Sequence, residues 1–286
     1  MSCIRWRPAL GLNCPPRRLT PLPPSSTIYF ISLVAAHTDV RRSNNMEIAA
    51  GIYDVAPPKR GYLKAGFSKA VIVDGGDGLI VIDTLYDADA GDILDEIKRI
   101  GKTPADIKHI VLTHSHRGHL GGLATLKRLS GAPVYAHPWE ADIISGDRGR
   151  QEPSLFVLNP IQTYPIIFFG RLTAAFTKHE PLTVDHMIDE GDKIGPLQVV
   201  HTPGHTPGHL ALYWPEQRAL ITGDAFVTWP MLCYGWPNSM LNHKQSWESL
   251  IKMAELDAEV LSPGHGDSIR QNGAAVLRNM VARGKV

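Results

Sequence analysis

The chain has 286 residues, of which 43% are hydrophobic and 20% are charged, and its formal net charge at pH 7 is +1. This composition is typical of one or two globular domains, and it lacks the basic face or stripe that nucleic-acid binding requires. The three cysteines, Cys3, Cys14 and Cys233, have neither the spacing of a disulfide framework nor that of a zinc-thiolate site, so they allow a reducing compartment.

Residues 1–45 differ in composition from the rest of the chain. Six prolines precede Ser25, and no acidic residue occurs before Asp39. The apolar run 28–36 is too short to span a bilayer, so we expect no transmembrane segment. The segment is either a targeting sequence, which would send the protein to an organelle or out of the cell, or an upstream extension. We favour the extension, with Met46 as the working start of a cytoplasmic protein and residues 46–286 as its folded domain.

From Met46 onward the chain alternates short apolar runs with amphipathic stretches. Residues 70–73 and 79–82 predict a β-hairpin with a glycine-rich turn, and apolar spacing from Asp89 to Ile100 predicts a helix. Strands 108–112 and 134–136 follow, with helices at 119–129 and 139–144. Further strands are predicted at 197–200, 210–213, 219–221 and 260–261, and further helices at 243–256 and 268–282.

Residues 146–190 fit this alternation least well, because four prolines interrupt them. Long irregular segments in compact domains are often lids or binding loops. The apolar run 166–169 is also open to a second interpretation, as a contact with another subunit of a homo-oligomer. We therefore predict a lid or insert at 146–190.

Three histidines, His114, His116 and His119, lie within six residues, directly after the apolar run 110–112. Neutral imidazole is the commonest protein ligand for zinc. A spacing of two at a strand end places His114 and His116 on the same side, and His119 can reach the same space from the first turn of the next element. The pattern indicates a metal site.

Three more polar positions follow short apolar runs. The first is the turn 201–209, which contains His201, His205 and His209. The second is the loop with Asp224, and the third is the loop with His265. Loops on a rigid scaffold are where binding sites are built. We therefore expect these side chains to converge with the first histidines at one edge of a sheet core.

Taken together, the motifs resemble those of the metallo-β-lactamase-fold hydrolases. The resemblance covers roughly residues 60–270 and implies an α/β fold, a four-layered αββα sandwich. It implies a first metal site of His114, His116 and His205, with Asp224 as a bridging carboxylate. His119 and His265 correspond to the second site, and Asp83 corresponds to an acid at an early strand end. His201 and His209 flank the ligand turn and are candidates for contacts behind the ligands.

One ligand position departs from the family pattern, His-x-His-x-Asp-His. The aspartate is replaced by Gly118, which offers no side-chain ligand. Three protein ligands can still hold zinc, but the missing charge weakens the second site. We therefore expect one secure zinc ion and a weaker second one.

A zinc-bound hydroxide would attack the carbonyl of an ester, lactone, thioester or amide, with Asp224 as the candidate that orients the water. Two alternatives remain: a mononuclear iron oxygenase of the persulfide type, and a catalytically inert metal-binding member of the family. Phe226, Trp229 and Trp236, which follow Asp224, together with His137, are candidates to line a pocket for a small, partly apolar substrate such as a lactone. Core packing is the competing interpretation for the aromatic residues.

Overall fold

The computed structural model describes residues 47–56, 68–149, 179–229, 231–235 and 239–284, which all belong to the unit Asn45–Val286. Residues 1–46, most of the predicted lid (150–178) and Trp236 lie outside the described residues. Within these ranges, none of the helices combines the length and the apolar character needed to cross a membrane.

The first sheet has seven strands in chain order. Strands β1 to β4 pair antiparallel, whereas β4, β5, β6 and β7 pair parallel. The strands are β1 (Glu47–Ala49), β2 (Ile52–Val55), β3 (Ala70–Asp74), β4 (Leu79–Ile82), β5 (Ile107–Val111), β6 (Val134–Ala136) and β7 (His186–Met187).

The second sheet has five strands in the order β14-β11-β10-β9-β8. Only the pair of β11 and β14 is parallel. The strands are β8 (Lys193–Ile194), β9 (Leu197–His201), β10 (Leu210–Trp214), β11 (Ala219–Gly223) and β14 (Val260–Pro263). A separate hairpin, β12 (Phe226–Val227) with β13 (Cys233–Tyr234), follows β11 directly.

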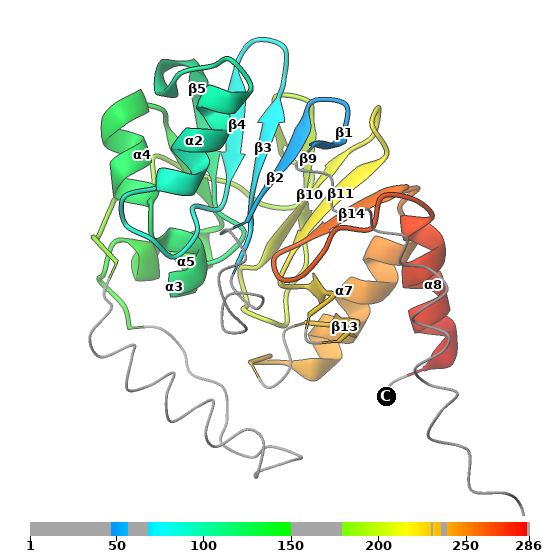
Figure 1. Cartoon of the computed structure of the whole chain (residues 1–286). Coiled ribbons are helices and arrows are strands. Elements are labelled where there is room, and N and C mark those ends of the chain that lie inside the picture. The colour runs from blue at the N-terminus through cyan, green and yellow to red at the C-terminus, as the bar shows by residue number, and fades with distance from the viewer. Residues whose placement is uncertain (1–46, 57–67, 150–178, 230, 236–238, 285–286) are drawn as a thin grey trace, which may run out of the picture. The chain divides into compact units, whose positions relative to one another are not determined.

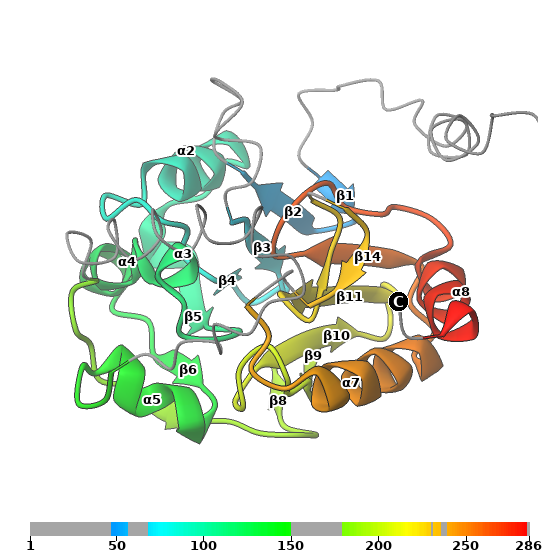
Figure 2. The same ribbon diagram turned by 90° about the horizontal axis from the view of Figure 1, so that it is seen from below.

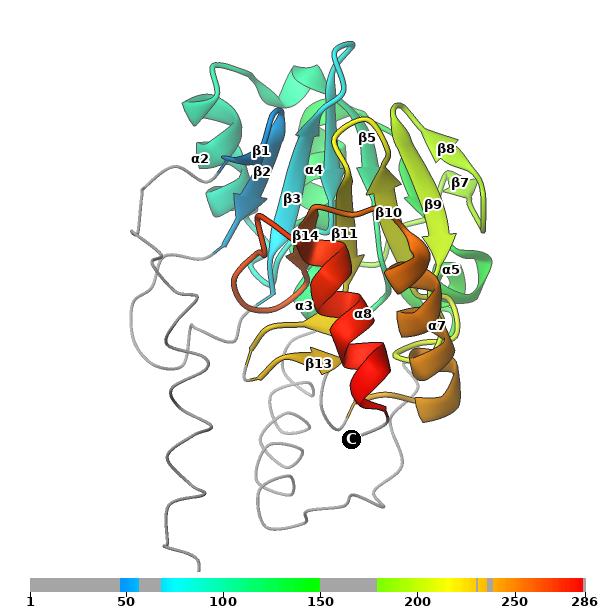
Figure 3. The same ribbon diagram turned by 90° about the vertical axis from the view of Figure 1, so that its right-hand side faces the viewer.

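Helices cover the outer faces of both sheets (Figures 1 and 2). The first sheet carries α2 (Gly91–Arg99), the 3-10 turn η2 (Pro104–Asp106), α3 (Arg117–Leu120), α4 (Leu123–Ser130) and α5 (Pro138–Ile144). The second sheet carries α7 (His243–Glu255) and α8 (Gly273–Arg283), seen side by side in Figure 3.

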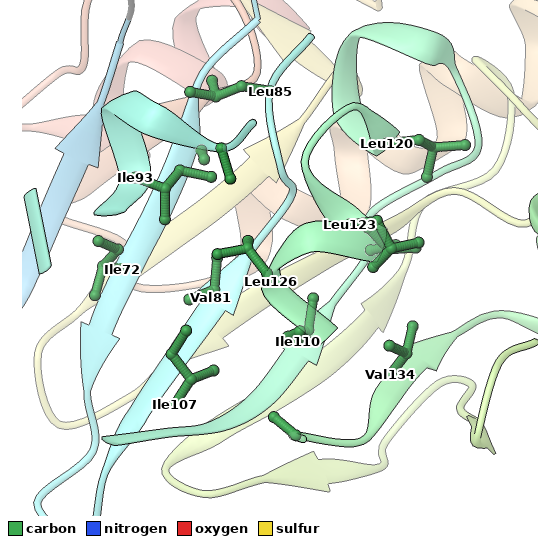
Figure 4. Packing of buried hydrophobic residues seen from close by; sticks show 14 of the residues in the cluster. Ile72, Val81, Leu85, Ile93, Ile107, Ile110, Leu120, Leu123, Leu126 and Val134 are labelled. Carbon is green, nitrogen blue, oxygen red and sulfur yellow. The ribbon is translucent and has the colours of Figure 1, made fainter. Parts of the chain in front are cut away.

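Three buried clusters separate these four layers, and strand alternation explains them. In β3, Ile72 packs toward the helices of the first sheet, while Val71 and Val73 pack between the sheets. In β10, Leu212 lies between the sheets and Ala211 faces α7 and α8. Figure 4 shows the outer cluster of the first sheet, where side chains of α2 and α4 meet those of β3 to β6. The predicted αββα sandwich is confirmed.

Several predicted element boundaries were wrong for local reasons. The helix predicted at 119–129 is divided into α3 and α4, because the backbone N–H groups of Gly121 and Gly122 donate to the carbonyls of Leu85 and Thr84. The closing helix begins at Gly273 instead of Ser268, since Ile269 pairs with Leu261 in a β-bridge. The strands β1, β2, β7, β8, β12 and β13 were not predicted, because they are short or lack a clear alternation.

The topology gathers the predicted site residues at one edge of the sandwich. Strands β4 and β5 are parallel, so Asp83 and the histidine loop after β5 leave the first sheet on the same side. Strands β11 and β14 are parallel, so Asp224 and His265 leave the second sheet together. A hydrogen bond from Leu210 N to Thr113 O, 2.9 Å long, joins the two sheets at this edge.

Candidate metal centre

Four side chains converge in a first group formed by His114, His116, His205 and Asp224. Each offers one ligand atom, and these atoms all lie within 4.8 Å of one another. His205 Nε2 lies 2.9 Å from His116 Nδ1 and 3.3 Å from Asp224 Oδ2. His114 Nε2 lies 3.8 Å from the same carboxylate oxygen. Three of the four residues are fully buried, and His116 is half-buried.

Hydrogen bonds behind the first group orient its rings. Thr113 Oγ1 donates to Asp83 Oδ2 over 2.8 Å, so the hydroxyl can accept only from His114 Nδ1, 3.0 Å away. His114 therefore carries its proton on Nδ1, and the lone pair of Nε2 points toward Asp224. Burial, followed by the neighbouring histidines, lowers the pKa of His114 well below its ordinary value and keeps this ring neutral.

Two buried atoms of this group have no hydrogen-bond partner among the described residues, namely His114 Nε2 and Asp224 Oδ1. A buried polar atom without a partner costs free energy. Here a lone pair on nitrogen faces a carboxylate, and two acceptors cannot bond to each other. A cation between His114 Nε2 and the Asp224 carboxylate would satisfy the nitrogen, so the residues fit a metal ion.

A second group contains His119, His265 and the shared Asp224. His119 Nε2 lies 3.6 Å from Asp224 Oδ1, and His265 Nε2 lies 3.3 Å from Asp224 Oδ2. Although burial would raise the pKa of Asp224, the surrounding His265, His119 and His205 hold it well below its ordinary value. Asp224 is thus an ionised carboxylate that belongs to both groups.

Asp83 lies behind both groups. Its Oδ1 accepts from Thr113 N and its Oδ2 from Thr113 Oγ1 and His119 Nδ1, each over 2.8 Å. Burial would lower the pKa of His119, but Asp83 and Asp224 outweigh it and raise that pKa. Asp83 adopts a left-handed backbone with φ of 59°, a conformation that aspartate tolerates better than most residues.

His209 contacts the centre from behind, as the sequence suggested, whereas His201 does not. His209 Nε2 accepts from Asp224 N over 3.0 Å, and its Nδ1 lies 2.8 Å from Thr202 Oγ1. The ring therefore holds the backbone of Asp224 and has no nitrogen left for a metal. His201 Nε2 instead contacts the Pro207 carbonyl, 2.8 Å away, and its ring stacks on His137.

His137, His201 and Asp189 form a third cluster of potential ligands, but its geometry does not suit a metal. The two rings are nearly parallel, at 13°, so their in-plane lone pairs do not converge. His137 Nδ1 accepts from Trp139 N over 3.0 Å at the start of α5, so in the neutral ring Nε2 carries the proton. His137, predicted to contact substrate, is instead the N-cap of a helix.

Comparison with known proteins agrees with the geometry of the first two groups. The model of the metallo-beta-lactamase superfamily matches residues 63–265. The chain belongs to this superfamily. A probable metallo-hydrolase of Bacillus subtilis, YflN, is 27% identical over 211 residues, covering 65% of this chain and 75% of the relative.

Two solved structures are similar to this chain. A family protein from Thermus thermophilus, TTHA1429, superposes with a TM-score of 0.60 at 24% identity, covering 83% of this chain and 80% of that protein. TTHA1623, solved in a di-iron-bound form, gives a TM-score of 0.55 at 28% identity, covering 75% of this chain and 93% of that protein.

Gly118, at the position where the superfamily pattern has aspartate, lies in the first turn of α3. A Cβ atom added there would lie 3.2 Å from Ser68 Oγ. The buried Ser68 hydroxyl donates to the Gly118 carbonyl, and the Ser68 backbone pairs with that of His265. Ser68 thus occupies space beside the missing side chain, next to a ligand of the second group.

The aromatic residues after Asp224 divide into core and surface. Phe226, predicted to line the pocket, is fully buried among the side chains that face α7 and α8, so this assignment was wrong. Trp229 remains 36% exposed, and Met231 and Leu232 beside it are more exposed. Thr228 N donates to His265 O over 3.1 Å, which fixes this apolar rim to the second group.

Sequence reasoning missed Glu140, Thr113 and Ser68. All three are buried, and each forms hydrogen bonds to the loops that carry the ligands. Thr113 precedes His114 and could have been suspected from adjacency alone. Glu140 and Ser68 gave no local signal, because their partners lie far away in sequence.

Proposed function

We propose that the protein is a zinc-dependent hydrolase that attacks the carbonyl group of an ester, lactone, thioester or amide. The observation that carries the proposal is the pair of buried, unpartnered acceptors, His114 Nε2 and Asp224 Oδ1, within a group of three imidazoles and one carboxylate. Imidazole nitrogen and carboxylate oxygen are typical zinc ligands.

His114, His116 and His205 would hold the ion, with Asp224 as the fourth ligand or as a bridge to a second ion at His119 and His265. A zinc ion at such a site lowers the pKa of water toward about 7 and polarises a carbonyl oxygen. The protein contributes neutral rings, because burial keeps the pKa of His114 well below its ordinary value. It also excludes bulk water, since His114, His119, His205 and Asp224 are buried.

Asp224 has two distinct oxygens for this chemistry. Oδ2 lies within 3.8 Å of the Nε2 atoms of His114, His205 and His265. Oδ1 is the unpartnered oxygen, 3.6 Å from His119 Nε2. We assign to Oδ1 the role of accepting a hydrogen bond from the attacking water. The aspartate of the superfamily pattern cannot take this role here, because Gly118 stands in its place.

The rim of the site favours a substrate with an apolar part. Trp229, Met231 and Leu232 are exposed on the loop between β12 and β13, which is bonded to the His265 loop. Apolar side chains in this position can cover an acyl chain or a lactone ring, and burying that surface contributes about 25 cal/mol per Å². We therefore propose a small, partly apolar acyl substrate.

A mononuclear iron oxygenase is the second candidate. It is favoured by the similarity to TTHA1623, which was solved with iron, and by a ligand set of imidazoles and a carboxylate that also suits iron. The two proposals differ in the metal and in the need for dioxygen. A catalytically inert member is the third possibility, in which metal is bound without turnover.

The test is elemental analysis of protein purified without added metal, followed by assays of a panel of esters, thioesters and lactones. We expect about one zinc ion per chain, as three-histidine sites commonly hold, and hydrolysis that disappears on chelation and returns with zinc. Bound iron together with dioxygen uptake on a persulfide would instead establish the oxygenase. Bound metal without turnover on either panel would indicate the inert member.

A further inference from the structure

A buried carboxylate joins the two loops that supply the first metal group. Glu140, in the first turn of α5, is 0% exposed. Its Oε2 accepts from Ser115 N over 3.1 Å and from Ser115 Oγ, and its Oε1 accepts from Gly208 N over 3.1 Å. Ser115 lies between two candidate ligands, and Gly208 lies in the turn that carries His205.

We infer that Glu140 is a positioning residue of the metal centre, holding both histidine loops in their ligating geometry. The inference rests on the proposed metal centre and extends it. The loop after β5 belongs to the first sheet, and the loop between β9 and β10 belongs to the second. One carboxylate therefore bonds across the sandwich at the edge where the ligands meet.

The choice of an acid at this position has a physical reason. All three described hydrogen-bond partners of Glu140 are donors, two N–H groups and one O–H group. A carboxylate offers only acceptors, so it satisfies all of them, whereas an amide would turn its NH₂ group toward at least one donor. Burying a charge costs free energy unless hydrogen bonds compensate it. An apolar side chain could fill this space without that cost, so packing alone does not explain the acid.

The turn is shaped to approach Glu140 closely. A Cβ atom added at Gly208 would lie 2.9 Å from Glu140 Oε1 and 2.7 Å from His137 Nδ1. Only glycine therefore allows the backbone N–H to reach the carboxylate. Residues at the start of α5 contact the turn 201–209 at both of its ends: Glu140 accepts from Gly208 N, and the ring of His137 stacks on that of His201.

The experiment compares the full-length protein with Glu140→Gln by titrating the metal-free forms with Co²⁺. Visible absorption of Co²⁺ reports both affinity and coordination geometry. We expect affinity for the first ion to fall by about 10–100-fold, the range seen when residues behind metal ligands are changed, and the absorption spectrum to change.

Thermal unfolding with and without metal separates positioning from a merely structural role. Loss of packing alone would lower the unfolding temperature equally in both forms. If Glu140 positions the ligands, metal binding should raise the unfolding temperature less in Glu140→Gln than in the parent. The reason is that a bound ligand stabilises the folded state more as its affinity rises.

Asp142→Asn is the matched control, since it removes an exposed carboxylate from the same helix, and it should behave like the parent. Ser115→Ala is the milder variant, which removes one of the three donors and should weaken Co²⁺ binding in the same direction if Glu140→Gln does not fold. Parent-like affinity and spectrum in both Glu140→Gln and Ser115→Ala would overturn the inference while leaving the proposed hydrolase intact. Failure of the parent to bind metal would overturn both.

Discussion

The two ligand groups share Asp224 and both have a ligand held by a buried hydrogen bond, yet they differ in ligand number. In the first group, three imidazoles and one carboxylate converge, and Thr113, Asp83 and Glu140 hold the loops. In the second, Asp83 orients His119 just as firmly, but the position of a further carboxylate is Gly118. The number of available ligands, more than the hydrogen bonds behind them, therefore distinguishes the two groups.

The largest expected effect comes from removing one ligand of each group. His116→Ala should abolish hydrolysis and lower affinity for the first ion by more than the roughly 100-fold seen for changes behind the ligands. His119→Ala should leave about one bound metal ion, because three ligands plus water hold a catalytic zinc. Metal content per chain after dialysis measures both. Two ions per chain that resist a mild chelator equally in the parent would contradict the asymmetry.

Restoring the carboxylate should make the groups more alike. Gly118→Asp places a charge beside the second ion and should tighten its binding at least tenfold, since one unit charge about 4 Å from another is worth several kcal/mol at an effective dielectric constant of about 20. Calorimetric titration of the second ion gives the comparison.

The neighbouring hydroxyl refines this experiment. The new Cβ would lie only 3.2 Å from Ser68 Oγ, so the double variant Gly118→Asp with Ser68→Gly should bind the second ion more tightly than the single variant. If neither variant binds the second ion better than the parent does, then either a different residue already supplies that ligand or His119 and His265 do not form a site.

The two groups should also differ in how pH affects the metal-free protein. Burial lowers the pKa of His114 and His209 well below 6.5, whereas Asp83 and Asp224 outweigh burial and raise that of His119. Below pH 6.5, His114 and His209 become protonated in the unfolded chain but stay neutral in the folded protein. The free energy of unfolding therefore falls on acidification by at most about 1.4 kcal/mol per pH unit for each ring. Above pH 6.5 stability falls as His119 loses its proton.

These three residues therefore predict a stability maximum near pH 6.5, the ordinary histidine value. Urea unfolding of the metal-free protein at several pH values measures it. His209→Gln, which keeps an acceptor for Asp224 N, should make the free energy of unfolding less dependent on pH below 6.5 and leave the dependence above 6.5 unchanged. An unchanged acidic slope in this variant would show that His209 is not the group responsible.

The smallest effect is expected at the rim, which is attached to the second group. Trp229→Ala should raise KM for substrates with a long apolar acyl group by up to about tenfold, as expected for losing part of one aromatic contact, while metal content stays unchanged. Acetyl esters serve as the matched substrates and should be little affected. Equal losses for short and long acyl groups would place Trp229 outside the substrate contact.

Sequence patterns predicted most of the strands and helices, because strand alternation and helical spacing are local properties, whereas the four layers were implied by the resemblance to the metallo-β-lactamase-fold hydrolases. The apolar run 70–73 predicted β3, and the candidate ligands could be found because each follows a short apolar run. Glu140 was missed because its partners, such as Gly208, lie far away in sequence, and no local pattern encodes such contacts. Phe226 was misjudged because it packs in a cluster formed by distant strands and helices, and His137 was misjudged because it caps α5 through Trp139 N.

The parallel pairing of β11 with β14 has a consequence for how the protein matures. Because His265 follows β14, the second group is complete only after β14 has paired with β11. A chain emerging from the ribosome displays His114, His116 and His119 long before Asp224 and His265 exist, and domains fold as units as synthesis proceeds. An early metal ion would meet three histidines without the carboxylate that distinguishes the finished centre. We therefore expect a metal ion to meet its complete ligand set only late, after β14 has paired with β11.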